Sequence, residues 1–266
     1  MLDVGIVGMP NAGKSTLFNA LLGRQIAQVA EYPFTTIEPN VGVVEVPDER
    51  LPRLGEIVTD RSVGSSHSSP TKVGDVKIVP AAIKFIDIAG LVKDAHKGAG
   101  LGNQFLAKIR ECHAILHVVR AFDNPQVAHV MGSIDPDRDI EIINEELKQA
   151  GIQKPTFVYL NKERPDEHTL DEIIRECYKL LDLLTMFTVE GGKQVQAWPV
   201  KRGTAVKEAV GMIHSDFAAK FIKAEVVPFE KLDAAGSYRE ARAKGWVRVE
   251  GKEYEVKDGD VVTVKI

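Results

Sequence analysis

Eight residues near the N-terminus constrain this chain more than any other segment. Residues 8–15 read GMPNAGKS, which matches the pattern G-x-x-x-x-G-K-[ST] and lies between an apolar run and a helix-like pattern. In that setting the glycines let successive N–H groups turn toward phosphates, and the following helix adds its positive dipole end. A chance glycine-rich turn would not need all four specified residues in this context. The segment therefore predicts a phosphate-binding loop (P-loop).

The side chains of this loop have distinct expected roles. Lys14 can reach the β- and γ-phosphates of a nucleotide, and the Ser15 hydroxyl can ligate Mg²⁺. We therefore expect Mg²⁺ as the cofactor and a nucleoside triphosphate as the substrate. The expected nucleotide contacts in this loop are Asn11, Ala12, Gly13, Lys14, Ser15 and Thr16.

A second segment supplies the other half of the predicted metal site. Residues 87–90 read DIAG and directly follow an apolar run. The Asp87 carboxylate can hold Mg²⁺ through water, and the Gly90 N–H can sense the γ-phosphate. Upstream, Thr36 is the candidate for a further Mg²⁺ ligand, with Thr35 as the fallback. An Asp-Gly strand end is common by itself, but its place after a second parallel strand favours the functional interpretation.

Apolar runs and helical patterns alternate from residue 2 to about residue 161, which predicts an α/β, doubly wound, mostly parallel sheet of the P-loop NTPase type. The polar, Ser-rich stretch 60–73 is expected to be a loop. The expected strands are 2–7, 81–86, 114–122 and 156–160, and the expected helices are 14–22, 103–111 and 139–150.

The pattern changes near residue 182. Short alternating runs at 194–200, 246–249 and 261–266 surround one helical stretch at 205–221. They predict a small α+β module of the β-grasp kind. We therefore expect a nucleotide-binding domain at 1–181 and a second domain at 182–266.

Composition narrows the remaining classes. The net charge of −4 argues against a surface coated with cations for unspecific nucleic-acid binding, and no DNA partner is expected. Cys112 and Cys177 fit no metal or disulfide spacing and are typical of reduced thiols in a cytoplasmic protein. Neither a signal peptide nor a membrane span is expected.

Taken together, these segments resemble the Obg-related translation-factor GTPases, and most closely the YchF family of Obg-like ATPases. The resemblance covers roughly residues 1–150 and 175–266, and its C-terminal part looks like that family's TGS domain. It implies nucleoside triphosphate hydrolysis coupled to association with the ribosome or another RNA. The segments that carry it are GIVGMPNAGKSTLFNALL (5–22), YPFTTIEPNVGVV (32–44), FIDIAGLVKDAHKGAGLGNQFLAKIREC (85–112), AWPVKRGTAVKEAVGMIHSDFAAKFIKAEVV (197–227) and GKEYEVKDGDVVTVKI (251–266).

The resemblance also bears on hydrolysis. Many switch GTPases place a Gln directly after D-x-x-G to orient the attacking water. This chain has Leu91 there, as the family does, and leucine cannot hydrogen-bond. His117 aligns with a family histidine and becomes a catalytic candidate beside Lys14 and Gly90. Without the resemblance, a packed strand histidine is the favoured interpretation. Slow intrinsic turnover is expected.

The base-reading segment departs from both patterns. GTPases use N-K-x-D, and the YchF family resembles N-x-x-E, whereas this chain has Asn161, Lys162, Glu163 and then Arg164. Arginine has donors only and cannot accept from guanine as an Asp does. Asn161 and Lys162 remain the expected base-side contacts, and the resemblance favours ATP over GTP.

The chain is also shorter than the family pattern. The family inserts a helical coiled coil after a segment like 139–147, whereas residues 148–151 here lead almost directly to the strand at 156. The stretch after Glu163 is shortened too, and no S-A-x segment follows. Either the chain is a reduced or engineered form, or its sequence omits segments at these places.

Two C-terminal clusters have competing interpretations. Five cations surround Trp246, which suits either RNA phosphates with a stacking indole or a solvated charged face diluted by acids. The run at 214–216 reads HSD, but adjacent helix residues point in different directions, so a cap or packing role is expected there. The cations are Arg239, Arg242, Lys244, Arg248 and Lys252, with Lys201 and Arg202 on a nearby turn.

Three function classes follow from these patterns. The favoured one is a Mg²⁺-dependent ATPase or GTPase that acts as a nucleotide switch on the ribosome or RNA, with a monomer as the favoured oligomeric state. A P-loop kinase of a small metabolite is the second, although no substrate clamp or catalytic acid is visible. The third is a degenerate nucleotide-binding module that hardly hydrolyses, which Leu91 and the altered base segment keep open.

Overall fold

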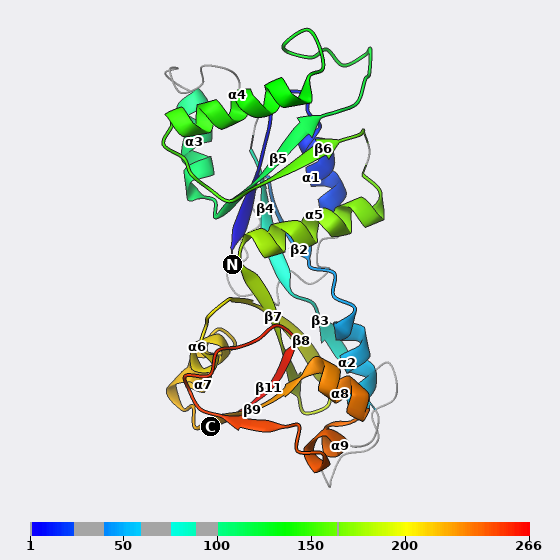
Figure 1. Cartoon of the computed structure of the whole chain (residues 1–266), viewed down its shortest axis with the longest axis vertical. Coiled ribbons are helices and arrows are strands. Elements are labelled where there is room, and N and C mark those ends of the chain that lie inside the picture. Colours follow the sequence, from blue (N-terminus) through cyan, green and yellow to red (C-terminus); the bar gives the residue numbers. More distant parts are fainter. Residues whose placement is uncertain (1, 24–39, 60–75, 89–100, 164) are drawn as a thin grey trace. The chain divides into compact units, whose positions relative to one another are not determined.

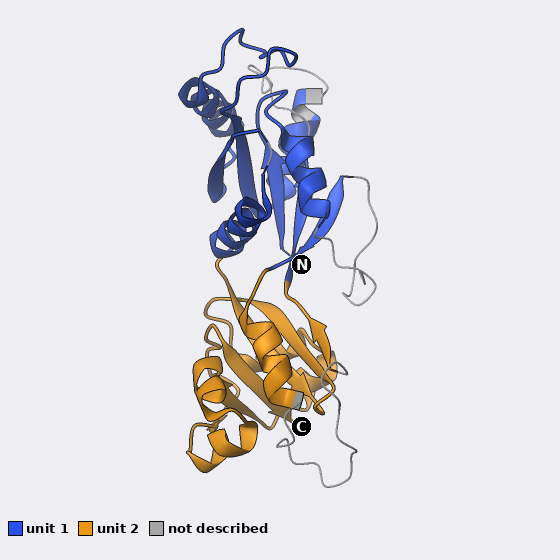
Figure 2. Cartoon of the chain, turned by 90° about the vertical axis from the view of Figure 1, so that its right-hand side faces the viewer, with its two compact units in different colours: residues 1–46, 82–181 blue, residues 47–81, 182–266 orange. Residues whose placement is uncertain are grey.

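The computed structural model describes residues 2–23, 40–59, 76–88, 101–163 and 165–266 (Figure 1). These residues form two compact units, coloured separately in Figure 2. The first unit holds 1–46 and 82–181, and the second holds 47–81 and 182–266. The expected domain at 1–181 therefore loses the segment 47–81, which belongs to the second unit.

The first unit contains a five-stranded sheet in the order β2-β4-β1-β5-β6. Its strands are β1 (Asp3–Val7), β2 (Val41–Glu45), β4 (Ala82–Asp87), β5 (Ala114–Arg120) and β6 (Thr156–Asn161). All pairs are parallel except β2 with β4. Every residue of β1 and β5 is buried, as expected of central parallel strands covered on both faces. The predicted doubly wound sheet is confirmed, with β2 as a strand that the patterns did not indicate.

Helices cover both faces of this sheet. The helices are α1 (Lys14–Leu22), α3 (Leu101–Glu111), α4 (Pro136–Gln149) and α5 (Glu167–Leu180). On one face, residues of α3 and α4 pack with Val7 and Ile115 of the sheet into a buried apolar cluster. α1 and α5 lie on the other face (Figure 1).

A tight turn at the end of α4 leads the chain directly toward β6. Gly151 has a φ of 68°, the left-handed conformation that ends many helices. Its N–H donates to Lys148 O at 3.0 Å, and the Ile152 N–H donates to Leu147 O at 2.8 Å. The chain then enters β6 directly. The described stretch 101–163 holds no inserted helical pair between α4 and β6.

The second unit is a six-stranded mixed sheet in the order β10-β9-β11-β7-β8-β3. The parallel pair of β11 and β7 lies at its centre, and antiparallel partners flank it, as expected of a β-grasp module. Its elements are α2 (Arg50–Thr59), β3 (Lys77–Val79), β7 (Leu183–Glu190), β8 (Gln194–Lys201), α6 (Val206–Gly211), α7 (Ser215–Ala219), β9 (Lys223–Pro228), α8 (Phe229–Ala235), α9 (Tyr238–Ala243), β10 (Arg248–Glu250) and β11 (Asp260–Lys265).

The prediction of one continuous helix at 205–221 is wrong, because the structure has two short helices there. α6 ends at Gly211, and His214 starts α7 as its N-cap, with Nδ1 accepting from the Asp216 N–H at 3.1 Å. A side chain that satisfies a free N–H at a helix start favours a new helix over continuation of the old one. The capping role expected for residues 214–216 is confirmed.

Strand pairing and buried side chains join the described residues of the segment 47–81 to the second unit. β3 pairs in parallel with β8, and Leu54 of α2 is fully buried. Arg50 donates to Asp48 and Asp258, each at 2.7 Å, and lies over the Phe187 ring. The pairing of β3 with β8 and the contact of Arg50 with Asp258 join residues far apart in sequence, which is why local patterns did not predict them. No helix within the described ranges is both long and apolar enough to cross a bilayer.

Candidate nucleotide site

The P-loop connects the end of β1 to the start of α1, as the pattern predicts. A Cβ on Gly8 would overlap the Val118 carbonyl oxygen on β5. Gly13 has a φ of 93°, and a Cβ there would overlap Asn161 Nδ2. Both positions therefore require glycine for space as well as for backbone conformation. Asn11, at the tip, is left-handed with a φ of 64°, which asparagine tolerates better than most residues.

Lys14 lies along this loop and is almost buried. The residue is 7% exposed, and Nζ donates to Met9 O at 2.8 Å. Burial lowers the pKa of Lys14 to about 8, against the opposing effect of Asp87. A polyanion bound at this point would favour the protonated amine.

The two predicted metal ligands of the described chain meet. Ser15 Oγ donates to Asp87 Oδ2 at 2.9 Å, although the residues are 72 positions apart. Asp87 ends β4 beside the carboxyl end of β1, so the parallel sheet brings the two residues together. Asp87 Oδ1 is buried without a hydrogen-bond partner among the described residues. A hydroxyl and an unsatisfied carboxylate oxygen form a donor set that suits a hard cation such as Mg²⁺.

Asn161 connects the base side of the site to the P-loop. It is 2% exposed, and its Nδ2 donates to Ala12 O at 2.9 Å. Its Oδ1 accepts from the Glu163 N–H at 3.2 Å. The amide of Asn161 is therefore used to hold two loops together. Lys162 is exposed beside it.

The acids near the base segment have other tasks. Asp166 accepts from the Thr169 N–H at 2.8 Å and is the N-cap of α5. Glu163 adopts a φ of 99°, an uncommon conformation for a residue with a side chain.

Thr16 is exposed on the first turn of α1. Thr35, Thr36, Gly90 and Leu91 lie outside the described residues, as does the Ser-rich stretch.

His117 lies in the middle of β5 and is 1% exposed. Neither ring nitrogen has a hydrogen-bond partner in the part of the chain that is described. Burial lowers the pKa of His117 to about 4; Lys14 adds to this and Asp139 opposes it. The ring is therefore neutral at physiological pH. Its catalytic role stays a prediction.

The burial of His117 predicts an acid-sensitive fold. Because its folded pKa of about 4 lies below the unfolded value, the unfolded chain binds a proton first as the pH falls through 6.5. The free energy of unfolding should therefore decrease between pH 6.5 and pH 4, by up to about 3 kcal/mol from this residue. His117→Leu should lose this slope in urea titrations followed by circular dichroism. His168→Gln, at an exposed position on α5, should keep it, and equal slopes for all three proteins would contradict the prediction.

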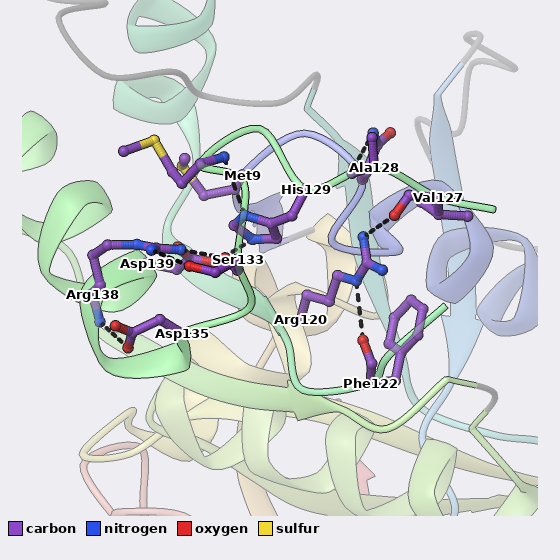
Figure 3. Close-up of polar contacts among 12 residues, drawn as sticks. Met9, Arg120, Phe122, Val127, Ala128, His129, Ser133, Asp135, Arg138 and Asp139 are labelled. Atoms are coloured by element: carbon purple, nitrogen blue, oxygen red, sulfur yellow. Dashed lines mark hydrogen bonds and ion pairs between the residues drawn. The ribbon is translucent and has the colours of Figure 1, made fainter. Parts of the chain in front are cut away.

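Sequence patterns missed Arg120, His129 and Asp139, which lie near the P-loop (Figure 3). Arg120 is 1% exposed, and His129 pairs with Asp139 at 2.8 Å in a buried position. The available signal was a cation at the end of the apolar run AILHVVR. Their partners lie within ten positions along the chain, but these hydrogen bonds form in an irregular loop and follow no periodic pattern.

Comparison with known proteins decides the family. A family model described as "50S ribosome-binding GTPase" matches residues 3–162, and one described as "Protein of unknown function (DUF933)" matches residues 183–266. The chain is 34% identical to the "Ribosome-binding ATPase YchF" of Bacillus subtilis, over 98% of each protein. It is also 34% identical to the protein of the same name from Escherichia coli O157:H7, over 97% of each protein. This chain belongs to the YchF family.

A solved structure agrees with this assignment. The YchF GTPase of Schizosaccharomyces pombe has a TM-score of 0.75 at 26% identity, over 99% of this chain and 97% of that one. The alignment with the Bacillus subtilis YchF is 375 positions long, whereas this chain has 266 residues. Because nearly all of both proteins is covered, the bacterial YchF carries internal residues that this member lacks. This sequence is therefore shorter internally than that of the Bacillus subtilis protein.

Proposed function

We propose that this YchF-family chain is a Mg²⁺-dependent nucleoside triphosphatase that prefers ATP and associates with the ribosome as a nucleotide switch. The observation that carries the proposal is the meeting of Ser15 and Asp87 beside Lys14, at the carboxyl ends of β1 and β4. Ligands of open α/β sheets bind at these strand ends. A P-loop kinase has no support from a second cationic clamp among the described residues near this site.

The described residues fit a magnesium ion. Ser15 and Asp87 would hold it, with Thr36 as the proposed further ligand. Bound there with the nucleotide, the ion would neutralise charge on the phosphates. Lys14 would bind the β- and γ-phosphates, and the P-loop N–H groups would orient them. Asn161 would keep Ala12 and Gly13 in place through its hydrogen bond to the Ala12 carbonyl.

The ATP preference has two supports. No Asp occupies the position that accepts from guanine, and Asp166, the nearest following Asp, is committed to capping α5. The bacterial relatives are named ATPases, although the fission yeast protein is named a GTPase. The residues and most of the relatives described above therefore favour adenine.

Ribosome association rests on the names of the relatives and of the matched family model. In the C-terminal unit, four of the five cations of the predicted basic cluster pair with acids: Arg239 with Glu240 at 3.6 Å, Arg242 with Glu225 at 2.8 Å, Arg248 with Glu250 at 3.5 Å and Lys252 with Glu253 at 3.8 Å. Lys244 instead lies 4.7 Å from the centre of the Trp246 ring. That corner is the described surface of this unit that best suits a nucleic-acid contact.

A two-step binding experiment tests the proposal. Calorimetric titration should give tighter binding of a non-hydrolysable ATP analogue than of its GTP counterpart, by about fivefold or more, and chelation of Mg²⁺ should weaken both. The analogue-bound protein should then sediment with 70S ribosomes to a greater extent than the nucleotide-free protein. A GTP preference would overturn the ATP assignment. Sedimentation that ignores the nucleotide would overturn the switch.

A barely hydrolysing module is the second candidate. It is favoured by the burial of His117, whose ring reaches no polar group in the described chain. Both candidates predict nucleotide binding, and they differ in the turnover that the Lys14 variant below is designed to measure.

A further inference from the structure

Arg120 is a buried cation whose hydrogen bonds go to backbone carbonyls of one loop. It ends β5, and the loop that follows, residues 121–135, is here called the β5–α4 loop. The guanidinium donates to Phe122 O at 3.1 Å, Val127 O at 2.9 Å and Asn124 O at 3.3 Å, and it stacks on the Phe122 ring (Figure 3). A buried charge requires such partners, so the loop and Arg120 fix each other.

The other end of the β5–α4 loop is fixed by α4. His129 Nδ1 accepts from the Met131 N–H at 3.2 Å, so the proton is on Nε2, which donates to Asp139 at 2.8 Å. The two side chains of this pair are 4% and 2% exposed. Arg138 donates to Ser133 O at 2.6 Å. Both ends of the loop are therefore tied to secondary structure of the first unit.

The middle of the loop touches the P-loop. Ala128 O accepts from Asn11 Nδ2 at 3.0 Å. Three consecutive residues thus have separate anchors: Val127 is held by Arg120, Ala128 holds Asn11, and His129 is held by Asp139. Because both neighbours of Ala128 are fixed, its carbonyl has a defined position. Asn11 needs such support, since its left-handed backbone is intrinsically unfavourable.

We propose that the β5–α4 loop is a template that holds the P-loop in its phosphate-binding conformation, and that Arg120 is a positioning residue acting through Ala128 and Asn11. The guanidinium of Arg120 is committed to the carbonyls of the β5–α4 loop. Its contribution is to remove conformational freedom from the P-loop before the phosphates arrive, which preorganises the site. The inference rests on the proposed function only for its effect on affinity.

Three variants separate this role from a general stabilising one. Arg120→Lys keeps the charge, but an ammonium cannot reproduce the planar fork that serves three carbonyls. Asn11→Gly removes the amide and still tolerates the φ of 64°. Arg110→Lys is the matched control, because Arg110 also donates to a carbonyl, Ala150 O at 2.9 Å, yet lies on α3 away from the P-loop.

The first measurement is amide hydrogen exchange of the nucleotide-free protein. Arg120→Lys should accelerate exchange in peptides from the β5–α4 loop and also in peptides covering residues 8–14. Asn11→Gly should accelerate the P-loop peptide alone, and Arg110→Lys should change neither. Faster exchange confined to the β5–α4 loop in Arg120→Lys would overturn the proposal. This readout is independent of any nucleotide activity.

The second measurement is the affinity for a Mg²⁺-bound, non-hydrolysable ATP analogue. Arg120→Lys and Asn11→Gly should each weaken binding by about fivefold, the range of one lost hydrogen bond. The double variant should be no weaker than the weaker single one, because both remove the same link. Losses that multiply to about 25-fold would overturn the proposed route through Asn11. A wild-type chain that binds no nucleotide would overturn the proposed function, while the exchange experiment would still decide the template.

Discussion

Lys14→Ala is expected to reduce ATP hydrolysis by about a thousandfold, the loss typical when a preorganised charge is removed from a developing anion. The residue is 7% exposed, and its Nζ already donates a hydrogen bond to Met9 O of the P-loop. Its position is therefore set before the nucleotide arrives. Steady-state phosphate release with Mg²⁺ and ATP is the measurement.

Lys108→Ala is the matched control for this experiment, since Lys108 is exposed on α3 and outside the site. It should retain the wild-type rate. We expect the Lys14→Ala variant to fold. Burial lowers the pKa of Lys14 to about 8, which means that the folded protein disfavours the charged amine, so removing it should not destabilise the fold. Equal, negligible release from wild type and Lys14→Ala would favour the binding module over the triphosphatase.

Gly8→Ala is expected to destabilise the first unit by about 3 kcal/mol or more and to abolish nucleotide binding. The added Cβ would overlap the Val118 carbonyl, a backbone atom of the fully buried central strand β5. A side chain could rotate away from such an overlap, but the β5 backbone is fixed by pairing on both sides. Either the P-loop or the strand must move.

Urea unfolding followed by far-ultraviolet circular dichroism is the appropriate measurement. Tryptophan fluorescence would report on the wrong unit, because both tryptophans, Trp198 and Trp246, belong to the second one. Gly251→Ala is the control, since a Cβ there meets nothing within 4 Å. A wild-type unfolding midpoint for Gly8→Ala would show that the P-loop approaches β5 less closely than described.

Sequence patterns predicted the elements that depend on residues close together in the chain. The apolar runs of β1 and β5 are buried along their whole length, so composition alone identifies them. The helix expected at 14–22 matches α1 at both ends. The pairing of Ser15 with Asp87 also follows from pattern, because parallel strands bring their carboxyl ends to one edge.

Sequence patterns missed the elements that depend on a distant partner or on a single side-chain hydrogen bond. β3 has only three residues and exists because β8 offers it a partner more than a hundred positions later. The break between α6 and α7 depends on a histidine cap, and histidine is not a typical capping residue. The amide of Asn161 also contacts Ala12, a hydrogen bond that its motif did not indicate. Such hydrogen bonds leave no periodic signal.

The discontinuous second unit has a consequence for synthesis on the ribosome. The first unit is complete once residue 181 has emerged, but Pro47–Ala81 then still lacks β7, β8 and β11. Its apolar side chains, including Leu51, Leu54 and Val79, must wait for the last strands of the chain before they are covered. A fragment starting at residue 182 would have the opposite defect, a sheet without β3 and α2. Residues 182–266 are therefore not an excisable module, because the second unit needs the segment 47–81 as well.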